Sequence, residues 1–227
     1  MLPFLRTAFI VAAAVGLLVA SPARAASDSE ELVIKSQLLL EKLRDHPEFE
    51  SYRRTFKEAK AVLVIPQLIK GAFIIGAEGG SGVLLARKDD GTWSHPAFFT
   101  LGAGSVGLQI GVQDTEVVFL IMTEAGLNAV ISHEVKLGVD ASVSFGPIGR
   151  GVEGSTTTGL GADIAAYSKS VGAFAGGALE GAVIHERMDY NREYYGDENA
   201  TARRIVIMDR YDNPQSNGIR NVLATHP

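Results

Sequence analysis

The chain has 227 residues, of which 46% are hydrophobic, carries a formal net charge of −5 and contains no cysteine. The missing cysteine excludes a disulfide-stapled fold and lipoprotein attachment through an acylated cysteine. An acidic chain without a strong basic block is a poor candidate for general nucleic-acid binding, and its length suits one domain with a substantial core.

The first 25 residues are predicted to form a secretory signal peptide. Arg6 supplies a positive n-region, residues 8–20 form an apolar stretch, and residues 23–25 read Ala-Arg-Ala, which is an A-x-A cleavage site. The apolar stretch is too short to span a bilayer core of about 30 Å. We therefore expect an exported protein, periplasmic or secreted. Its mature chain has 19 lysines and arginines against 26 acids, a net charge of −7.

Residues 26–60 are predicted to form an amphipathic and basic helical region. A first helix is expected over Ser27–Arg44, with Ser29 as its cap, and the His46-Pro47 pair should end it. A second, strongly charged helix is expected over Glu48–Lys60. The apolar face of the first helix comprises Leu32, Ile34, Leu38, Leu39, Leu40 and Leu43.

From residue 61 onward, glycines punctuate short runs of β-branched and aromatic residues, which is typical of many short strands. A buried strand over Ala61–Ile65 should end at Pro66, and two strands between Gly71 and Ala86 should meet at Gly79-Gly80. Further strands are predicted at Phe98–Leu101, Gly107–Val112, Glu116–Met122, Val139–Phe145, and within Gly151–Ser170 and Gly172–Ile184.

Short helices and loops complete the chain. Thr123 should cap a short helix that ends near Ser132, and residues 191–199 suggest a polar loop. A strand or helix at Arg204–Met208 and a terminal helix near Gly218–Ala224 follow.

These elements predict an α+β fold: a glycine-rich, strongly bent antiparallel β-sheet or barrel, with helices at both termini and one β-rich core over residues 61–227. The expected core residues are Val62, Val64, Ile74, Val83, Leu85, Trp93, Phe98, Ile110, Phe119, Ile121, Val143, Phe145 and Phe174.

Catalytic motifs are incomplete throughout the chain. Residues 102–107 match G-x-G-x-x-G, but a strand-like alternation follows where a dinucleotide site needs a helix. His133-Glu134 and His185-Glu186 lack the second histidine of a zinc hydrolase, and residues 79–82 lack the spacing of a nucleophile elbow. We therefore expect no enzyme, no metal site and no cofactor.

Cations concentrate between residues 35 and 70, where eight stand against five acids, a local net charge of +3. An anionic membrane surface could use the apolar helix face together with about 1 kcal/mol per nearby cation. The alternative is a helix that packs its apolar face on the core and leaves a solvated charged face. The candidate lipid-binding residues are Lys35, Lys42, Arg44, Arg53, Arg54, Lys57, Lys60, Leu32, Leu39 and Leu43.

A second candidate anion site involves Arg87 and Arg150. Arg150 follows the Gly146-Pro147 turn, whose backbone amides could help to hold an anion. A turn beside a solvated arginine is the alternative interpretation of the same residues.

The run from about Ala61 to Gly196 resembles the SYLF domain, a lipid-binding module. The matching segments, in order, are residues 79–87 (GGSGVLLAR), 90–96 (DGTWSHP), 106–111 (VGLQIG), 137–150 (LGVDASVSFGPIGR), 167–181 (YSKSVGAFAGGALEG) and 195–196 (YG).

The resemblance implies lipid binding. Eukaryotic members bind phosphoinositides, occur beside Src-homology or FYVE modules in membrane-trafficking and actin-regulating proteins, and use an N-terminal amphipathic helix that corresponds to Ser29–Arg44. Unlike those members, this chain is expected to carry an export signal and no fused partner module. We therefore expect an exported protein, peripherally associated with membranes, that recognises anionic phospholipid or phosphoinositide-like head groups. The alternative is a structural or interaction module of the cell envelope without a lipid ligand; the sequence identifies no protein partner.

Overall fold

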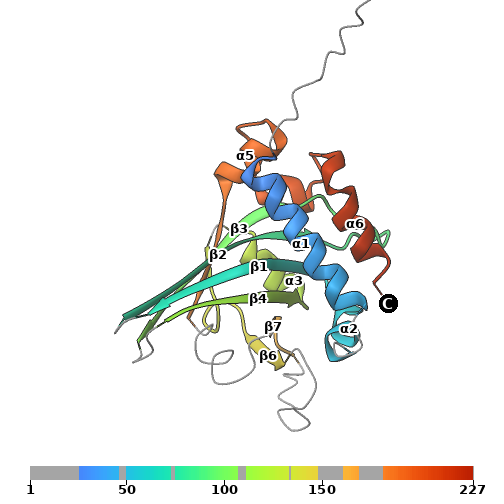
Figure 1. The fold of residues 1–227 in the computed structure, drawn as a ribbon. Coiled ribbons are helices and arrows are strands. Elements are labelled where there is room, and N and C mark those ends of the chain that lie inside the picture. Colours follow the sequence, from blue (N-terminus) through green and yellow to red (C-terminus); the bar gives the residue numbers. More distant parts are fainter. Residues whose placement is uncertain are drawn as a thin grey trace, which may run out of the picture.

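The computed structural model describes residues 26–45, 50–72, 75–106, 111–132, 134–147, 161–168 and 181–226. Within these residues, an eight-stranded, strongly curled sheet has the order β5-β8-β3-β2-β1-β4-β7-β6, with helices packed against it (Figure 1). The strands are β1 (Ala61–Ala72), β2 (Ile75–Ala86), β3 (Ala97–Val106), β4 (Gly111–Ile121), β5 (Glu134–Lys136), β6 (Val143–Pro147), β7 (Ile164–Ser168) and β8 (Val183–Glu186). The helices are α1 (Asp28–Asp45), α2 (Glu50–Phe56), α3 (Glu124–Val130), α5 (Met188–Tyr195), η2 (Arg203–Ile207), η3 (Pro214–Ser216) and α6 (Asn217–Ala224).

The described strand pairs are antiparallel except for β6 and β7, which are parallel. The predicted α+β class and bent sheet are therefore confirmed. Of the expected core, eight residues are buried: Val62, Val64, Val83, Leu85, Trp93, Phe98, Phe119 and Ile121. Val143 is half-buried, and the side chains of Ile74, Ile110, Phe145 and Phe174 lie outside what the structure describes.

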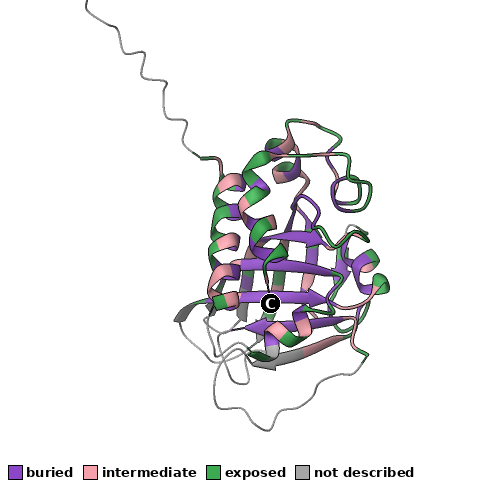
Figure 2. Cartoon of the chain, turned by 90° about the vertical axis from the view of Figure 1, so that its right-hand side faces the viewer, coloured by how far each residue is buried: buried purple, intermediate pink, exposed green. Residues whose placement is uncertain are grey.

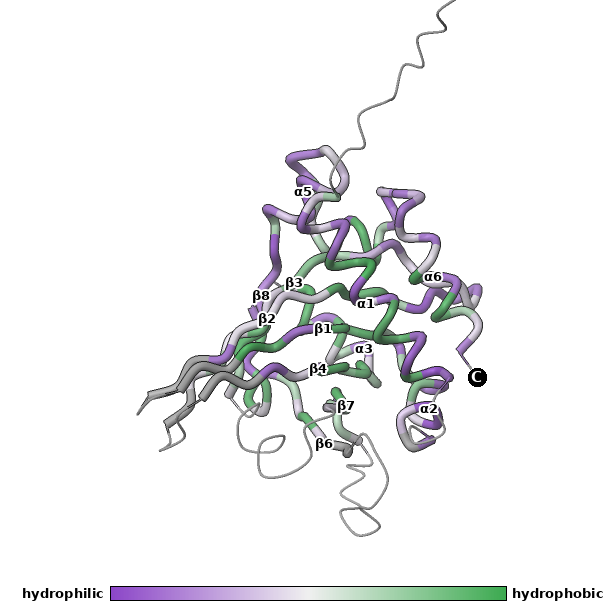
Figure 3. Tube along the Cα trace, viewed as in Figure 1, coloured by the Kyte–Doolittle hydropathy of each residue, from purple (hydrophilic) through white to green (hydrophobic). Residues whose placement is uncertain are grey.

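The sheet is covered on both faces, so successive residues of β1 point into two different cores. Val62 and Val64 face the core made with α1, α2, α5 and α6, which we call the helix face. Leu63 and Ile65 face the core made with α3 and η2, which we call the inner face. Figure 2 shows the central strands as buried, and Figure 3 shows hydrophobic residues along β1, β3 and β4 beside α1. This double coverage explains why β1 begins as a continuous apolar run.

The prediction that β1 ends at Pro66 is wrong. The strand continues to Ala72, and its pairing shifts register between Val64 and Ile69 against β2, and between Ile65 and Leu68 against β4. A proline, which has no backbone N–H, is tolerated at such an irregularity.

Gly79 and Gly80 lie inside β2 and not in a turn, which corrects the predicted hairpin. A Cβ atom at Gly80 would overlap the carbonyl oxygen of Gln67, and one at Gly82 would overlap that of Val64. The bulged strand therefore passes so close to β2 that only glycine fits at these two positions.

Three further boundaries differ from prediction. Ser27, and not Ser29, caps α1: the Glu30 amide donates to Ser27 Oγ (3.3 Å) and the Ser27 amide to Glu30 Oε2 (3.2 Å), a capping box. Residues 138–140 form a turn, with Gly138 at φ +81°, so the alternation from Val139 becomes a strand only at residue 143. Residues 188–195 form α5 where a loop was predicted. The helix near Thr123 and the terminal helix α6 occur as predicted.

Candidate functional site

Helix α1 lies across the helix face with its main apolar stripe against the sheet (Figure 1). Leu32, Leu39 and Leu43 are all buried in this core. In this structure, these three candidate lipid-binding leucines therefore hold the fold together and do not face solvent, which is the alternative that the sequence left open. Two apolar residues of α1 point outward instead: Ile34 is 52% exposed and Leu38 is 58% exposed.

The three candidate cations of α1 each have an acidic partner. Lys35 pairs with Glu31 (2.7 Å), Lys42 with Glu116 on β4 (2.6 Å), and Arg44 with Asp45 (2.6 Å). The hydrogen bond to Glu31 raises the pKa of Lys35, and the hydrogen bond to Arg44 lowers the pKa of Asp45. These charges are largely balanced locally, so α1 alone is a weak anion site.

Helix α2 and the residues after it carry four further candidate cations. We call Arg53, Arg54, Lys57 and Lys60 the basic end. Arg54 and Lys57 are exposed and form no ion pair within the described part of the chain. Lys60 is exposed and reaches Glu124 at 3.5 Å, whereas Arg53 is half-buried.

A histidine packs beside the basic end. The His226 ring packs on Phe56 with a centroid distance of 4.2 Å, and on Tyr52 at 5.4 Å. Burial, followed by the charges of Arg44 and Arg53, lowers the pKa of His226 to about 4, while Asp45 opposes this shift. His226 is therefore neutral at pH 7 and adds no charge to the basic end.

Arg87 is not the exposed anion site that the sequence suggested. Its guanidinium lies over the rings of Trp93 (4.9 Å) and Phe56 (5.5 Å), and Nη2 donates to the Phe56 carbonyl (3.1 Å). Burial lowers the pKa of Arg87. The side chain therefore joins α2 to the sheet through cation–π contact. Arg150, its proposed companion, lies outside the described residues.

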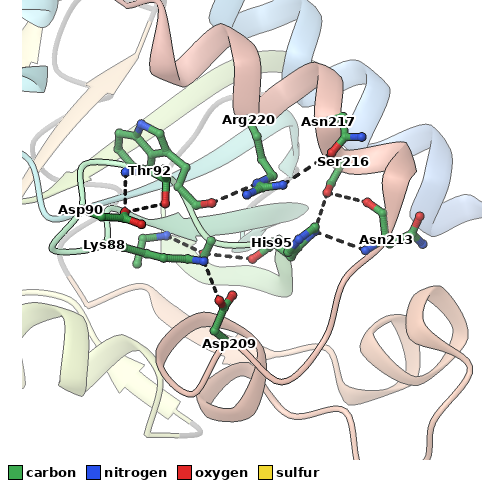
Figure 4. A network of polar contacts seen from close by, with 12 residues as sticks. Lys88, Asp90, Thr92, His95, Asp209, Asn213, Ser216, Asn217 and Arg220 are labelled. Atoms are coloured by element: carbon green, nitrogen blue, oxygen red, sulfur yellow. Dashed lines mark hydrogen bonds and ion pairs between the residues drawn. The ribbon is translucent and has the colours of Figure 1, made fainter.

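The segment 90–96, which reads DGTWSHP, ties the C-terminal elements to the sheet (Figure 4). Asp90 Oδ1 accepts hydrogen bonds from the Thr92 amide (2.8 Å) and hydroxyl (2.6 Å), which fixes the turn after β2. Arg220 of α6 donates to the Trp93 carbonyl (2.9 Å). Trp93 itself is only 2% exposed and stacks on Phe56.

His95 and Ser216 point toward one another in Figure 4, with Nδ1 and Oγ 2.8 Å apart. The resemblance to a histidine–serine catalytic pair is superficial. Ser216 is fully buried and donates its hydroxyl to the Asn213 carbonyl (2.7 Å), while the Asn213 amide approaches Nδ1 (3.3 Å). Burial lowers the pKa of His95. The pair therefore anchors the segment before α6.

Glu186 of the second His-Glu motif also has a structural role. Its buried Oε1 accepts hydrogen bonds from Asn191 Nδ2 (2.9 Å) and the Ala202 amide (2.6 Å). Among the residues that the structure describes, no group of three histidines and acids could hold a metal ion. In the same part of the chain, none of the helices combines the length and apolarity that crossing a bilayer requires.

A shallow cleft of about 270 Å³ lies where α1, the β1 bulge, β2 and α5 meet. Its lining includes Glu31, Lys35, Ile69, Gly79 and Tyr190. Glu31 and Lys35 pair with each other, and Gln67, which also lines the cleft, donates to Asp114, so these polar side chains already have partners within the fold.

Sequence reasoning missed two features of the surface. It did not separate Ile34 and Leu38 from the buried stripe, although helical spacing places them on the side opposite Leu39 and Leu43. It also did not identify the cluster of arginines around η2. Arg203, Arg204 and Arg210 lie within eight residues of sequence.

The curled sheet, its glycine close approaches and the tied 90–96 segment define an α+β domain, and comparison with known proteins identifies its family. A family model described as Ysc84, Las17-binding protein actin regulator, matches residues 102–226. The chain belongs to this family, the SYLF family that the sequence resembled.

Relatives include LAS seventeen-binding protein 3 of Saccharomyces cerevisiae, 39% identical over 153 residues, which are 66% of this chain and 33% of the relative. The SH3 domain-containing YSC84-like protein 1 of Xenopus laevis is 34% identical over 146 residues, 64% of this chain and 44% of the relative. The chain thus spans between a third and a half of these relatives. No solved structure matches it significantly.

Proposed function

We propose that this protein is exported, has no enzymatic activity and binds anionic membrane surfaces peripherally through the basic end. The observation that supports this best is the exposure of Arg54 and Lys57 without ion pairs among the described residues. They follow α1, whose outward face presents Ile34 and Leu38. Anionic phospholipid or phosphoinositide-like head groups fit these exposed cations.

The burial of Leu32, Leu39 and Leu43 limits how the protein would bind. Inserting these leucines into a membrane would remove them from the helix-face core, at a cost of about 2 kcal/mol or more each. The proposed contact is therefore a surface contact, with α1 still packed on the sheet. Since the mature chain has a net charge of −7, attraction must act within a Debye length of about 8 Å.

Vesicle flotation with the mature protein tests this proposal. Neutralising Arg54 and Lys57 together, as Arg54→Gln/Lys57→Gln, should remove about 2 kcal/mol of binding free energy, which is about thirtyfold in affinity for phosphatidylserine vesicles. Arg203→Gln/Arg210→Gln removes the same charge from two exposed positions elsewhere and serves as the matched control. Equal binding of the two variants would show that the basic end is not the site.

Export has its own test. The full-length protein should be found outside the cytoplasm with Ala26 as its first residue, because the cleavage site ends at Ala25. If N-terminal sequencing finds Met1 as the first residue of the protein, export through this leader is contradicted.

A protein-interaction module is the second candidate function. Its support is the names of the family and of the yeast relative, both of which describe binding to Las17. In an exported protein the equivalent partner would be another component of the cell envelope. Flotation separates the two functions, because a protein-interaction module without a lipid ligand would remain with the unbound fraction at every lipid concentration.

A further inference from the structure

The short helix η2 has an unusual geometry that sorts its side chains into two groups. It is a π-helix, in which the Met208 amide donates to the Arg203 carbonyl five residues earlier (3.1 Å). Such wide turns are rare and are frequent at functional sites. At this pitch, Ile205 and Val206 turn together into the inner-face core, where both are buried. Residues 203, 204, 207 and 208 are left on the outward side, and all four are exposed.

Two adjacent large apolar residues are therefore presented to solvent. Ile207 is 46% exposed and Met208 is 52% exposed. Other exposed large apolar residues in the described part of the chain, such as Ile69 and Val139, have no such neighbour in sequence. An aliphatic side chain next to a methionine makes an adaptable apolar contact.

Arginines surround this apolar pair. Arg203 and Arg210 are exposed, and neither side chain has an ion pair or hydrogen bond within the described residues. Arg204 is exposed and donates to the Asn199 carbonyl (3.2 Å). The acid between them is occupied, because Asp209 pairs with Lys88 at 2.6 Å (Figure 4). Arg204 also interacts with Asp197 and Tyr211, so Arg203 and Arg210 are the arginines that remain available to a carboxylate partner.

Contacts of the residues after η2 hold this surface in place. Asp209 adopts a left-handed backbone conformation with φ +51°, which is uncommon for a residue other than glycine. Its ion pair with Lys88 fixes η2 to the loop after β2, and Tyr211 donates to Asp197 Oδ2 (2.9 Å) just beyond. A preformed surface loses little conformational entropy when it binds.

We propose that the outward surface of Arg203, Arg204, Ile207, Met208 and Arg210, the arginine–methionine patch, docks an acidic amphipathic segment of a partner protein. The carboxylates of that segment would face the arginines, and its aliphatic side chains would cover Ile207 and Met208. The helix η2 that carries the patch packs in the inner-face core, whereas α1 and α2 pack in the helix-face core. The apolar pair between the arginines favours an amphipathic protein segment over a lipid head group, which would meet only the charges.

The test uses the mature protein and a phage-displayed library of random peptides long enough for about four helical turns. Selection should enrich peptides rich in Asp and Glu with aliphatic residues spaced three or four apart. The affinity of the best peptide is then measured by fluorescence anisotropy. We expect Arg203→Glu/Arg210→Glu, and separately Ile207→Ser/Met208→Ser, to weaken its binding at least about tenfold.

Arg54→Glu/Lys57→Glu, which makes the same charge change at two exposed positions outside the patch, should alter peptide binding less than about twofold. Thermal melts of all variants establish that each is folded. Enriched peptides without acidic residues, or equal binding by patch and control variants, would overturn the proposal. It would also be overturned if the Arg203/Arg210 variant lost binding to phosphatidylserine vesicles while the Arg54/Lys57 variant kept it, because the patch would then be a membrane surface.

Discussion

The segment 90–96 and the basic end both concentrate polar and charged residues, but they differ in where those residues find their partners. In the segment, Asp90, His95 and the Trp93 carbonyl all bond within the protein. At the basic end, Arg54 and Lys57 face solvent without an ion pair in the described residues. A conspicuous motif can therefore be purely structural, while a less regular run of cations stays exposed to solvent.

Of the variants proposed here, Trp93→Ala should lower the free energy of unfolding most. The side chain is buried against Phe56 and under Arg87, so its removal leaves a cavity at the junction of α2 and the sheet. We expect a loss of about 3 to 5 kcal/mol in the free energy of unfolding, measured by urea denaturation. A change near zero would show that the segment does not anchor the fold.

Glycine substitutions in the sheet test the close approach of β1 to β2. Gly82→Ala places a methyl group against the Val64 carbonyl and should cost about 1 to 3 kcal/mol. Gly102→Ala is the matched control in the neighbouring strand, because its Cβ would meet nothing within 4 Å. Urea denaturation of the control should therefore show no loss of stability; similar losses in both variants would contradict the close approach of β1 to β2.

The pH dependence of stability should follow His226. Its pKa is about 4 in the folded protein against 6.5 for the free side chain, so the unfolded chain takes up the proton first as pH falls. Stability is then fully present above pH 6.5 and is lost toward pH 4, by about 2 kcal/mol between pH 7 and pH 5. His226→Gln should remove this part of the loss in urea denaturation at the two pH values. If His226→Gln loses as much stability between pH 7 and pH 5 as the wild type does, another group causes the loss.

The smallest effect should come from the basic end. Arg54→Gln/Lys57→Gln removes two exposed charges that stabilise nothing in the described fold, so the free energy of unfolding should change by less than about 0.5 kcal/mol. A thermal melt measures this directly. A large loss of stability would mean that these cations are structural, like Arg87.

The sequence was sufficient to predict elements whose signals are local. The helix after Thr123, the terminal helix and the burial of Trp93 follow from capping, spacing and composition. The path of β1 through Pro66 could not be predicted, because it depends on glycines in β2 that accommodate the bulge from across the sheet. Local pattern also could not assign Arg87 to a cation–π contact, since its aromatic partner Phe56 lies 31 positions away.

For the candidate site, the cations could be located from the sequence, but their partners could not. The pairing of Lys42 with Glu116 joins residues 74 positions apart and becomes visible only in the folded chain. Likewise, the apolar face of α1 is equally compatible with a membrane and with a core until the sheet is placed beside it. The arginines around η2 are exposed because η2 is a π-helix, and no periodicity in the sequence predicts a π-helix there.

The most direct test of the central claim is a phosphatidylserine-vesicle titration of two variants side by side, Ser216→Ala in the tied region and Arg54→Gln/Lys57→Gln at the basic end. Ser216→Ala breaks the hydrogen bonds to His95 and Asn213, so it should lower stability and leave vesicle affinity at the wild-type value. The basic-end variant should bind about thirtyfold more weakly while melting normally. If the basic-end variant binds vesicles as tightly as wild type, the available cations are not the lipid-binding site.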